Sequence, residues 1–299
     1  RTAESGSIVV VTVPDVTVPE GEEISMWRML AVALVLAFTG QGEIGRGLDA
    51  VSGQSPTAET VLALARAALG TSRVQVRTLE FEVQKKLGAA GPSMATYSLA
   101  LPGQFLRVES DLVLPGRVYR GFNESQMIAR REGGEDAVIR PEFRQKMYAR
   151  IKADATWLSV AFLLAADTPI PLQYAYVARA EAPDGAADAI DAKGADGFAA
   201  RLFIDTDTRR LVMLSHQVPA PGKVVQHRDG ERVTATVEKP AGGEDTIEER
   251  WYLSDFIAAD GVFLPRRISV TRDGREVQQW EIRRVTINPR FPKDKFRVK

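Results

Sequence analysis

The second half of the chain is punctuated by Asp-Gly dipeptides that lie between runs of strand-like residues. The dipeptides are Asp229–Gly230, Asp260–Gly261 and Asp273–Gly274, and the runs around them are "VTATVEK", "TIEERWYLSDF", "FLPRRISVTR" and "REVQQWEIRRVTI". Asp-Gly supplies the positive φ angles of a type I′ turn, which joins two neighbouring antiparallel strands. From residue 197 onward, the sequence therefore predicts an antiparallel meander.

Further strands precede this meander. In "RVQVRTLEFEVQKK" the alternation of apolar and polar residues slips by one near Thr78, which predicts a bulge in a long strand. "ATYSLALPGQFLRVESDL" predicts two strands joined at Pro102–Gly103, and "GRVYRGF" and "SQMIARRE" predict two shorter ones separated by Asn123. Residues 181–197 are rich in Ala, Asp and Gly and predict a surface loop or a weak edge strand. About 10–12 antiparallel strands result, and so large a twisted sheet is expected to curl.

The first helix is expected just before these strands. Ser55 is a candidate N-cap with Pro56 at the first helical position, and Gly70 lies just past the end. The apolar residues between them form one stripe of an amphipathic helix, made of Val61, Leu62, Ala65, Ala68 and Leu69.

The second helix is expected over about residues 141–166, "PEFRQKMYARIKADATWLSVAFLLAA". Its C-terminal half is apolar nearly all round, so it has to be covered on more than one side. A helix lying inside a curved sheet satisfies this requirement, and so does a helix wedged between the sheet and a loop. The predicted fold class is α+β: a large curved antiparallel sheet, an unclosed β-barrel, with helices packed on or in its concave face.

Residues 26–42, "MWRMLAVALVLAFTGQG", have the layout of a secretory signal. The apolar h-region covers residues 29–38, and "AVSG" at 50–53 offers a cleavage site. A buried helix of the folded domain is the alternative. Residues 1–25 are interpreted as upstream sequence before a start at Met26, with an N-terminal strand as the alternative. We therefore expect an extension plus signal peptide over 1–52, a single domain over 53–299, and a periplasmic location.

The residue composition excludes several kinds of chemistry. The chain has no cysteine, which excludes disulfides, thiol nucleophiles, cysteine metal sites and a lipid-bearing cysteine anchor. Its two histidines, His216 and His227, cannot build a histidine-rich metal site, and no G-x-S-x-G serine elbow accompanies them. Lys plus Arg equals Asp plus Glu at 39 each, so the electrostatic footprint of a nucleic-acid binder is missing. We expect no metal, no cofactor and no nucleic-acid partner.

One segment does resemble a catalytic motif. In "RLFIDTDTRR" Asp205 and Asp207 follow an apolar run, as do the carboxylates of a D-x-D phosphatase signature. That signature ends in Thr or Val where this chain has Arg209, and it requires a following helix where this chain has a second strand-like run. A hairpin turn explains the four polar residues from Asp205 to Thr208 better.

The order of these features resembles the LolA-like superfamily of bacterial lipoprotein-sorting carriers. The resemblance covers about residues 57–298 and runs through "TAETVLALARAALG", "LPGQFLRVE", the central apolar helix, "GFAARLFIDTDTRRLVMLSH", "DFIAADGVFLPRRISV" and "VTINPRFPKDKF". These motifs are structural, and none of them is catalytic. The resemblance implies an unclosed β-barrel whose apolar cavity holds acyl chains or lipids under a helical lid.

The function implied by the resemblance is non-enzymatic binding of a lipid or an acylated protein, with transient membrane contact. The candidate cavity-lining residues are Trp157, Leu158, Phe162, Met213, Trp251 and Trp280. Alternatively, these side chains fill the core solidly. Two further hypotheses are an envelope sensor that binds a protein partner at the open barrel edge, and an exported hydrolase with an unrecognised site.

Overall fold

The computed structural model describes residues 56–88, 90–110, 116–133, 139, 141–182, 185–220, 223–229, 232–238 and 246–297. The expected signal peptide and upstream extension lie outside these residues. The helices are α1 (Ala58–Leu69), α2 (Pro141–Leu163) and the short 3₁₀ turn η1 (Ala195–Gly197). The strands are β1 (Thr78–Leu87), β2 (Ala90–Ala100), β3 (Gln104–Ser110), β4 (Arg117–Asn123), β5 (Gln126–Arg131), β6 (Gln173–Ala182), β7 (Gly185–Lys193), β8 (Ala199–Asp205), β9 (Leu211–Pro219), β10 (Lys223–Asp229), β11 (Arg232–Glu238), β12 (Thr246–Ala259), β13 (Val262–Arg272) and β14 (Arg275–Ile287).

Twelve of the strands form one curved sheet in the order β5-β4-β3-β2-β1-β14-β13-β12-β9-β8-β7-β6. Every neighbouring pair is antiparallel. The sheet is not closed, because β5 and β6 form its two edges. The predicted class, an unclosed antiparallel barrel of 10–12 strands with helices, is confirmed.

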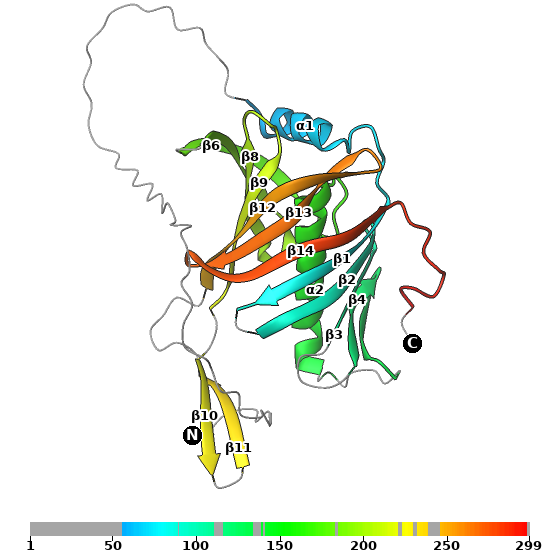
Figure 1. Cartoon of the computed structure of the whole chain (residues 1–299), viewed down its shortest axis with the longest axis vertical. Coiled ribbons are helices and arrows are strands. Elements are labelled where there is room, and N and C mark those ends of the chain that lie inside the picture. Colours follow the sequence, from blue (N-terminus) through cyan, green and yellow to red (C-terminus); the bar gives the residue numbers. More distant parts are fainter. Residues whose placement is uncertain are drawn as a thin grey trace, which may run out of the picture.

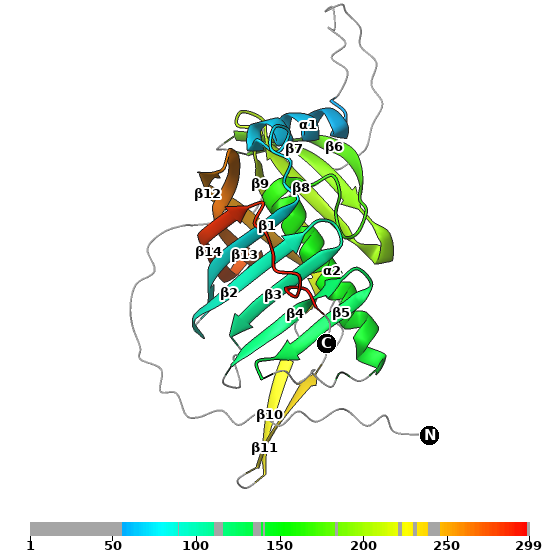
Figure 2. The ribbon, with the colours of Figure 1, turned by 90° about the vertical axis from the view of Figure 1, so that its right-hand side faces the viewer.

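Helix α2 connects β5 at one edge of the sheet to β6 at the other. Figures 1 and 2 show it running inside the curve. Its rings contact both halves: Phe162 stacks on Phe81 of β1 at 4.4 Å between centroids, and Trp157 stacks on His216 of β9 at 4.1 Å. Of the two arrangements that the sequence left open, the structure has the helix inside the sheet.

The Asp-Gly turns bear out the predicted meander. Asp260 and Gly261 both have positive φ, at 48° and 83°, and join β12 to β13. Asp273 and Gly274 do the same between β13 and β14, at 47° and 73°. Gly230 of the third dipeptide lies outside the described residues. The strands on either side of it, β10 and β11, form a separate two-stranded ribbon that projects from the sheet (Figure 1).

The helix boundaries differ from the expected ones by a few residues. The N-cap of α1 is Thr57 rather than Ser55, and its hydroxyl oxygen accepts a hydrogen bond from Thr60 N at 3.2 Å. Gly70 ends the helix in the left-handed region at φ 85°, as predicted. Helix α2 ends at Leu163 rather than near residue 166, and Leu164 follows it with φ 45°.

Two strand expectations were wrong. Residues 185–193 form β7, an internal strand paired with β6 and β8, rather than a loop or weak edge. Strand β6 was missed altogether. The predicted bulge near Thr78 is instead the point where β1 begins, and the register shift toward β14 lies between Glu82 and Val83. Pairing with neighbouring strands overrides the weak strand propensity of Ala and Asp in β7.

Helix α1 lies across one end of the sheet (Figure 2) and buries four of the five predicted stripe residues, Val61, Leu62, Ala65 and Leu69, whereas Ala68 is half-buried. It is tied to the end of α2, because Arg66 Nε donates to Leu164 O at 2.8 Å. Among the described residues, neither helix is long and apolar enough to cross a membrane.

Candidate functional site

The concave face of the sheet is apolar and aromatic at its centre. On β1 the inward side chains Leu79, Phe81 and Val83 are each at most 1% exposed. Rings on neighbouring strands continue this surface: Tyr97 lies 4.9 Å from Phe81 and 5.6 Å from Trp280 between ring centroids. Strands β2, β1 and β14 therefore present one continuous apolar face toward α2.

Five of the six candidate lining residues come together on or under this face. Trp157, Leu158 and Phe162 lie on α2, Trp251 lies on β12 and Trp280 on β14, and none is more than 8% exposed. The rings of Trp251 and Trp280 are 5.3 Å apart between centroids. Trp280 also borders a small groove, but a ligand could reach all five side chains together only if α2 withdrew.

The sixth candidate, Met213, lies apart from the other five. In the pairing of β9 with β12, Met213 is opposite Tyr252 and Leu214 is opposite Trp251. Side chains alternate between the two faces of a strand. Because Trp251 points into the concave face, Met213 lies on the convex side, where Tyr252 is 39% exposed.

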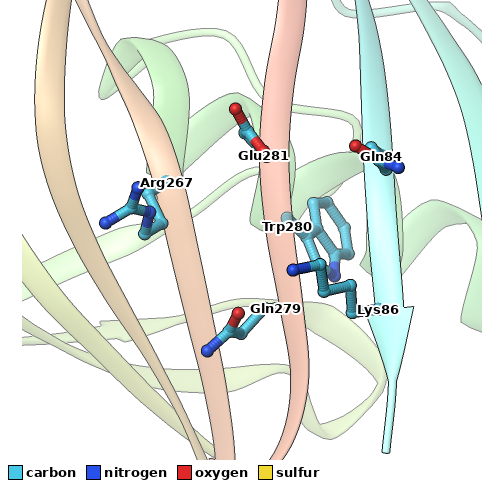
Figure 3. A pocket seen from close by; sticks show the side chains of 6 residues that line it. All are labelled: Gln84, Lys86, Arg267, Gln279, Trp280 and Glu281. Atoms are coloured by element: carbon cyan, nitrogen blue, oxygen red, sulfur yellow. The ribbon is translucent and has the colours of Figure 1, made fainter. Parts of the chain in front are cut away.

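A small groove lies where β13, β14 and β1 adjoin, and Figure 3 shows its lining. The lining residues are Gln84, Lys86, Arg267, Gln279, Trp280 and Glu281. Its volume is about 140 Å³, whereas drug-sized ligands occupy pockets of about 300–1,000 Å³. A polar groove of this size does not suit an acyl chain.

Toward one end of the concave face the apolar surface gives way to ionisable side chains. We call this group the inner polar belt; it consists of Lys85, Arg107, Glu109, Arg120, Asp154, His216, Glu249 and Arg272. In its first half, Glu109 of β3 lies 3.3 Å from each of three cationic groups, those of Lys85, Arg107 and Arg120. Arg107 also reaches Asp154 of α2 at 3.4 Å. These distances are longer than the roughly 2.7–2.9 Å of a close charge-assisted hydrogen bond.

In the second half of the belt, Glu249 is held more tightly. It accepts hydrogen bonds from Trp251 Nε1 at 2.9 Å and from Arg272 Nε at 2.7 Å. His216 Nε2 lies 3.4 Å from the same carboxylate. Burial lowers the pKa of His216 to about 4, against the opposing charge of Glu249. The imidazole is therefore neutral at pH 7 and packs as an aromatic ring.

Several polar atoms in and beside the belt lack a hydrogen-bond partner within the described part of the chain. They are Trp280 Nε1, His216 Nδ1 and Arg107 Nε, the last of which lies near Glu109 as an ion pair without hydrogen-bond alignment. Most buried polar groups in folded proteins are paired. Three unpaired nitrogens in one region mark it as a candidate binding site.

The two aspartates of the D-x-D segment form a turn. Asp205 Oδ1 accepts hydrogen bonds from Thr208 N and Thr208 Oγ1, both at 2.6 Å. Burial opposes ionisation of Asp205, but the Thr208 hydrogen bonds outweigh it and lower the pKa of the carboxyl. The described residues contain no group of three or more His, Asp or Glu side chains that could hold a metal.

The sequence interpretation missed the inner polar belt. One signal was present: Leu79, Phe81 and Val83 alternate inward on β1, and the same alternation places Lys85 on the inner face. Lys85 is only 6% exposed, and lysine side chains are rarely buried to this extent. The other members come from strands and a helix distant in sequence, and no local pattern connects them.

Comparison with known proteins gave matches at the level of structure. No family model matches the chain, and no curated protein sequence matches it. A LolA superfamily protein from Nitrosomonas europaea is 10% identical with a TM-score of 0.45, and the match covers 82% of this chain and 99% of that one. A domain described as an outer membrane lipoprotein-sorting protein from Vibrio parahaemolyticus is 8% identical with a TM-score of 0.43, over 80% and 97% of the chains.

A complex of MucA and MucB from Pseudomonas aeruginosa is more distant. Its matching chain is 9% identical with a TM-score of 0.21, and the match covers 75% of this chain and 92% of that one. At such identities the likeness concerns the fold. The solved structures similar to this chain include a protein of the LolA superfamily.

Proposed function

We propose that this protein is a non-enzymatic periplasmic binder of an acyl chain, carried by a lipid or an acylated protein. The observation that carries the proposal is the concave face, a continuous apolar and aromatic surface covered by the single helix α2. An acyl chain offers no groups for hydrogen bonding, so its site needs a large apolar surface and no catalytic motif. The secretory layout of residues 26–42 supports the periplasmic location.

In this proposal the acyl chain takes the place of α2. Withdrawing the large apolar side chains that α2 buries costs about 1.5–3 kcal/mol each, or about 9–18 kcal/mol together; they are Ile151, Trp157, Leu158, Val160, Phe162 and Leu163. A chain of about 14 methylenes gains about 0.8 kcal/mol for each methylene buried, which is about 11 kcal/mol. The two quantities are similar in size, so an exchange of helix for ligand is reversible and needs no covalent step.

The first experiment tests occupancy. The full chain is expressed in a bacterial host, recovered from the periplasm without detergent, and measured by native mass spectrometry. We expect a fraction of the protein to carry a lipid mass, and stripped protein to bind palmitate and hexadecanol. Empty protein that binds neither compound would overturn the proposal.

A second experiment tests the exchange with α2. Phe162 is fully buried against Phe81, so Phe162→Ala loosens the helix. If α2 competes with the ligand, this variant binds hexadecanol more tightly than the wild type does. Leu64→Ala is the matched control, because Leu64 is a helical residue of α1 and is 46% exposed. An unchanged or lower affinity of Phe162→Ala would show that α2 does not compete.

A protein partner is the second candidate, favoured by the free edge of the sheet. Strand β6 has ten residues, and its register breaks between Tyr176 and Ala178, leaving Val177 44% exposed. An unpaired edge strand is a template for strand addition. If a partner pairs with β6, Val177→Pro should abolish capture of that partner in periplasmic pull-downs while leaving lipid binding unchanged. Equal capture of the partner by the wild type and by Val177→Pro would argue against binding at this edge.

A further inference from the structure

In the first half of the inner polar belt, the side chains that come from the sheet carry more positive than negative charge. Lys85, Arg107 and Arg120 project from β1, β3 and β4, and each lies 3.3 Å from the carboxylate of Glu109. Among the described strands, the ion pairs therefore give these three cations one shared carboxylate. A further carboxylate comes from α2, where Asp154 lies 3.4 Å from Arg107.

Unused hydrogen-bond donors lie in the same place. Lys85 is 6% exposed, and within the described part of the chain its hydrogen-bond partner is Glu109, with the rings of Tyr97 and Trp280 each 5.0 Å away. Trp280 is also 6% exposed, and its Nε1 has no partner among the described residues. A buried donor without an acceptor is unfavourable. An anionic oxygen at this point would accept hydrogen bonds from both groups.

Helix α2 presents a carboxylate and an apolar stripe to this same face. Asp154, Leu158 and Phe162 are spaced four residues apart, so they lie on one side of the helix. At about 1.5 Å per residue, Leu158 lies about 6 Å and Phe162 about 12 Å from Asp154 along the axis. Leu158 and Phe162 are at most 1% exposed. These three side chains thus form an elongated apolar row with an acid at one end, which is also the arrangement of an acyl chain with an acidic head.

We propose that the concave face binds an anionic amphiphile, whose head is a carboxylate or a phosphate and whose tail is one acyl chain. The head binds Lys85, Arg107 and Arg120 in the place that Asp154 occupies, and the tail lies where Leu158 and Phe162 pack. Asp154 is then an internal competitor for the head. This inference rests on the proposed function, because it names the class of lipid for the same face.

The surroundings of Asp154 are consistent with a displaceable group. Burial raises the pKa of its carboxyl, and Glu249 adds to the effect, against the opposing charges of Arg107, Arg150 and Lys85. The ionised form of Asp154 is therefore poorly stabilised. Unlike the carboxylate of Asp154, the carboxylate or phosphate of a ligand is not attached to a folded helix. It also brings additional oxygen atoms that can accept hydrogen bonds from Lys85 and Trp280.

The test compares ligands that differ in the head alone. Palmitate, 1-palmitoyl lysophosphatidic acid and hexadecanol are titrated into the full chain, and binding is followed by tryptophan fluorescence. We expect both anions to bind at least about tenfold more tightly than the alcohol, the value of a hydrogen bond to a charged group. Preference for one anion over the other identifies the head as carboxylate or phosphate. Inorganic phosphate alone should bind weakly, because it lacks the tail.

Three variants separate head recognition from tail binding. Arg107→Gln should lose the preference for anions and keep the affinity for hexadecanol, and Arg107→Lys should restore part of that preference. Asp154→Asn should bind palmitate about tenfold more tightly, because the competing charge is gone. Arg130→Gln is the matched control: Arg130 pairs with Tyr119 on the opposite face of β4 and β5. Thermal unfolding of each variant verifies that it is folded.

The outcomes distinguish this inference from the proposed function. If no amphiphile binds, the proposed function fails. If hexadecanol and palmitate bind the wild type equally and Arg107→Gln changes neither, acyl binding stands and recognition of an anionic head is wrong. Tighter palmitate binding in Arg107→Gln than in the wild type would also overturn the inference.

Discussion

Acidification should destabilise the protein through His216 before the carboxylates of the chain are fully protonated. The His216 side chain is 5% exposed, stacks on Trp157 at 4.1 Å between centroids, and lies 3.4 Å from Glu249. Burial lowers its pKa from 6.5 to about 4, and Glu249 opposes the change without cancelling it. His216 therefore binds a proton less readily in the folded state than in the unfolded state.

The magnitude follows from this difference. The two pKa values, 6.5 and about 4, are about 2.5 units apart, and each unit corresponds to about 1.4 kcal/mol. Above pH 6.5 both states hold a neutral ring, so His216 has no effect on stability. As the pH falls from 6.5 to 4 the unfolded state binds more protons, and the free energy of unfolding decreases by up to about 3 kcal/mol.

The assay is urea unfolding followed by tryptophan fluorescence, at half-unit steps from pH 7.5 to 4.5. His216→Gln removes the titrating ring, so its free energy of unfolding should fall less steeply over this range than that of the wild type. The comparison uses the slope, because the variant also loses the contact with Trp157. His227→Gln serves as the control, since it removes the chain's other histidine. Equal slopes for the wild type and His216→Gln would refute the reasoning.

Three further substitutions test how the sheet and its turns are built. A Cβ on Gly121 would lie 2.0 Å from Phe105 O, so Gly121→Ala should lower the free energy of unfolding by about 3 kcal/mol or prevent folding. A Cβ on Gly91 meets nothing within 4 Å, so Gly91→Ala should leave the free energy of unfolding, measured in urea, nearly unchanged. Asp188 is 1% exposed and is flanked by two arginines; since both arginines keep solvent contact, Asp188→Asn should lower the free energy of unfolding by about 1–2 kcal/mol. Asp205→Ala removes two turn hydrogen bonds, so it should cost about 1 kcal/mol and leave palmitate binding unchanged; a loss of binding would revive the catalytic or ligand interpretation of the D-x-D segment.

The parts of the fold that the sequence predicts are those fixed by local chemistry. Asp260–Gly261 and Asp273–Gly274 take positive φ because of their own residue types, so the hairpins between β12, β13 and β14 could be placed from the sequence. The same holds for Gly70 at the end of α1. The turn at Asp205 is also local, since its hydrogen bonds to Thr208 span three residues.

The parts that could not be predicted depend on pairing across the sheet. In β7, Ala and Asp have weak strand propensity, yet β6 and β8 on either side supply hydrogen bonds to both edges. Asp188 is buried there because Arg179 and Arg209 reach it from β6 and from the turn before β9. The composition of residues 185–193 indicates neither the strand pairing nor the ion pairs of Asp188, and it therefore resembles that of a loop.

The candidate site follows from one topological fact that no local pattern shows. Helix α2 joins the two edge strands and runs along the concave face, where Phe162 contacts β1 and Trp157 contacts β9. The inner polar belt thus brings the charges of Lys85 from β1 and Glu249 from β12 close enough to act on Asp154. Under the proposed exchange of α2 for a ligand, the sheet residues stay in place while the helix residues leave. Specificity for the head therefore belongs to Lys85, Arg107 and Arg120, and control of access belongs to α2, so substitutions in these two sets should alter ligand preference and ligand affinity separately.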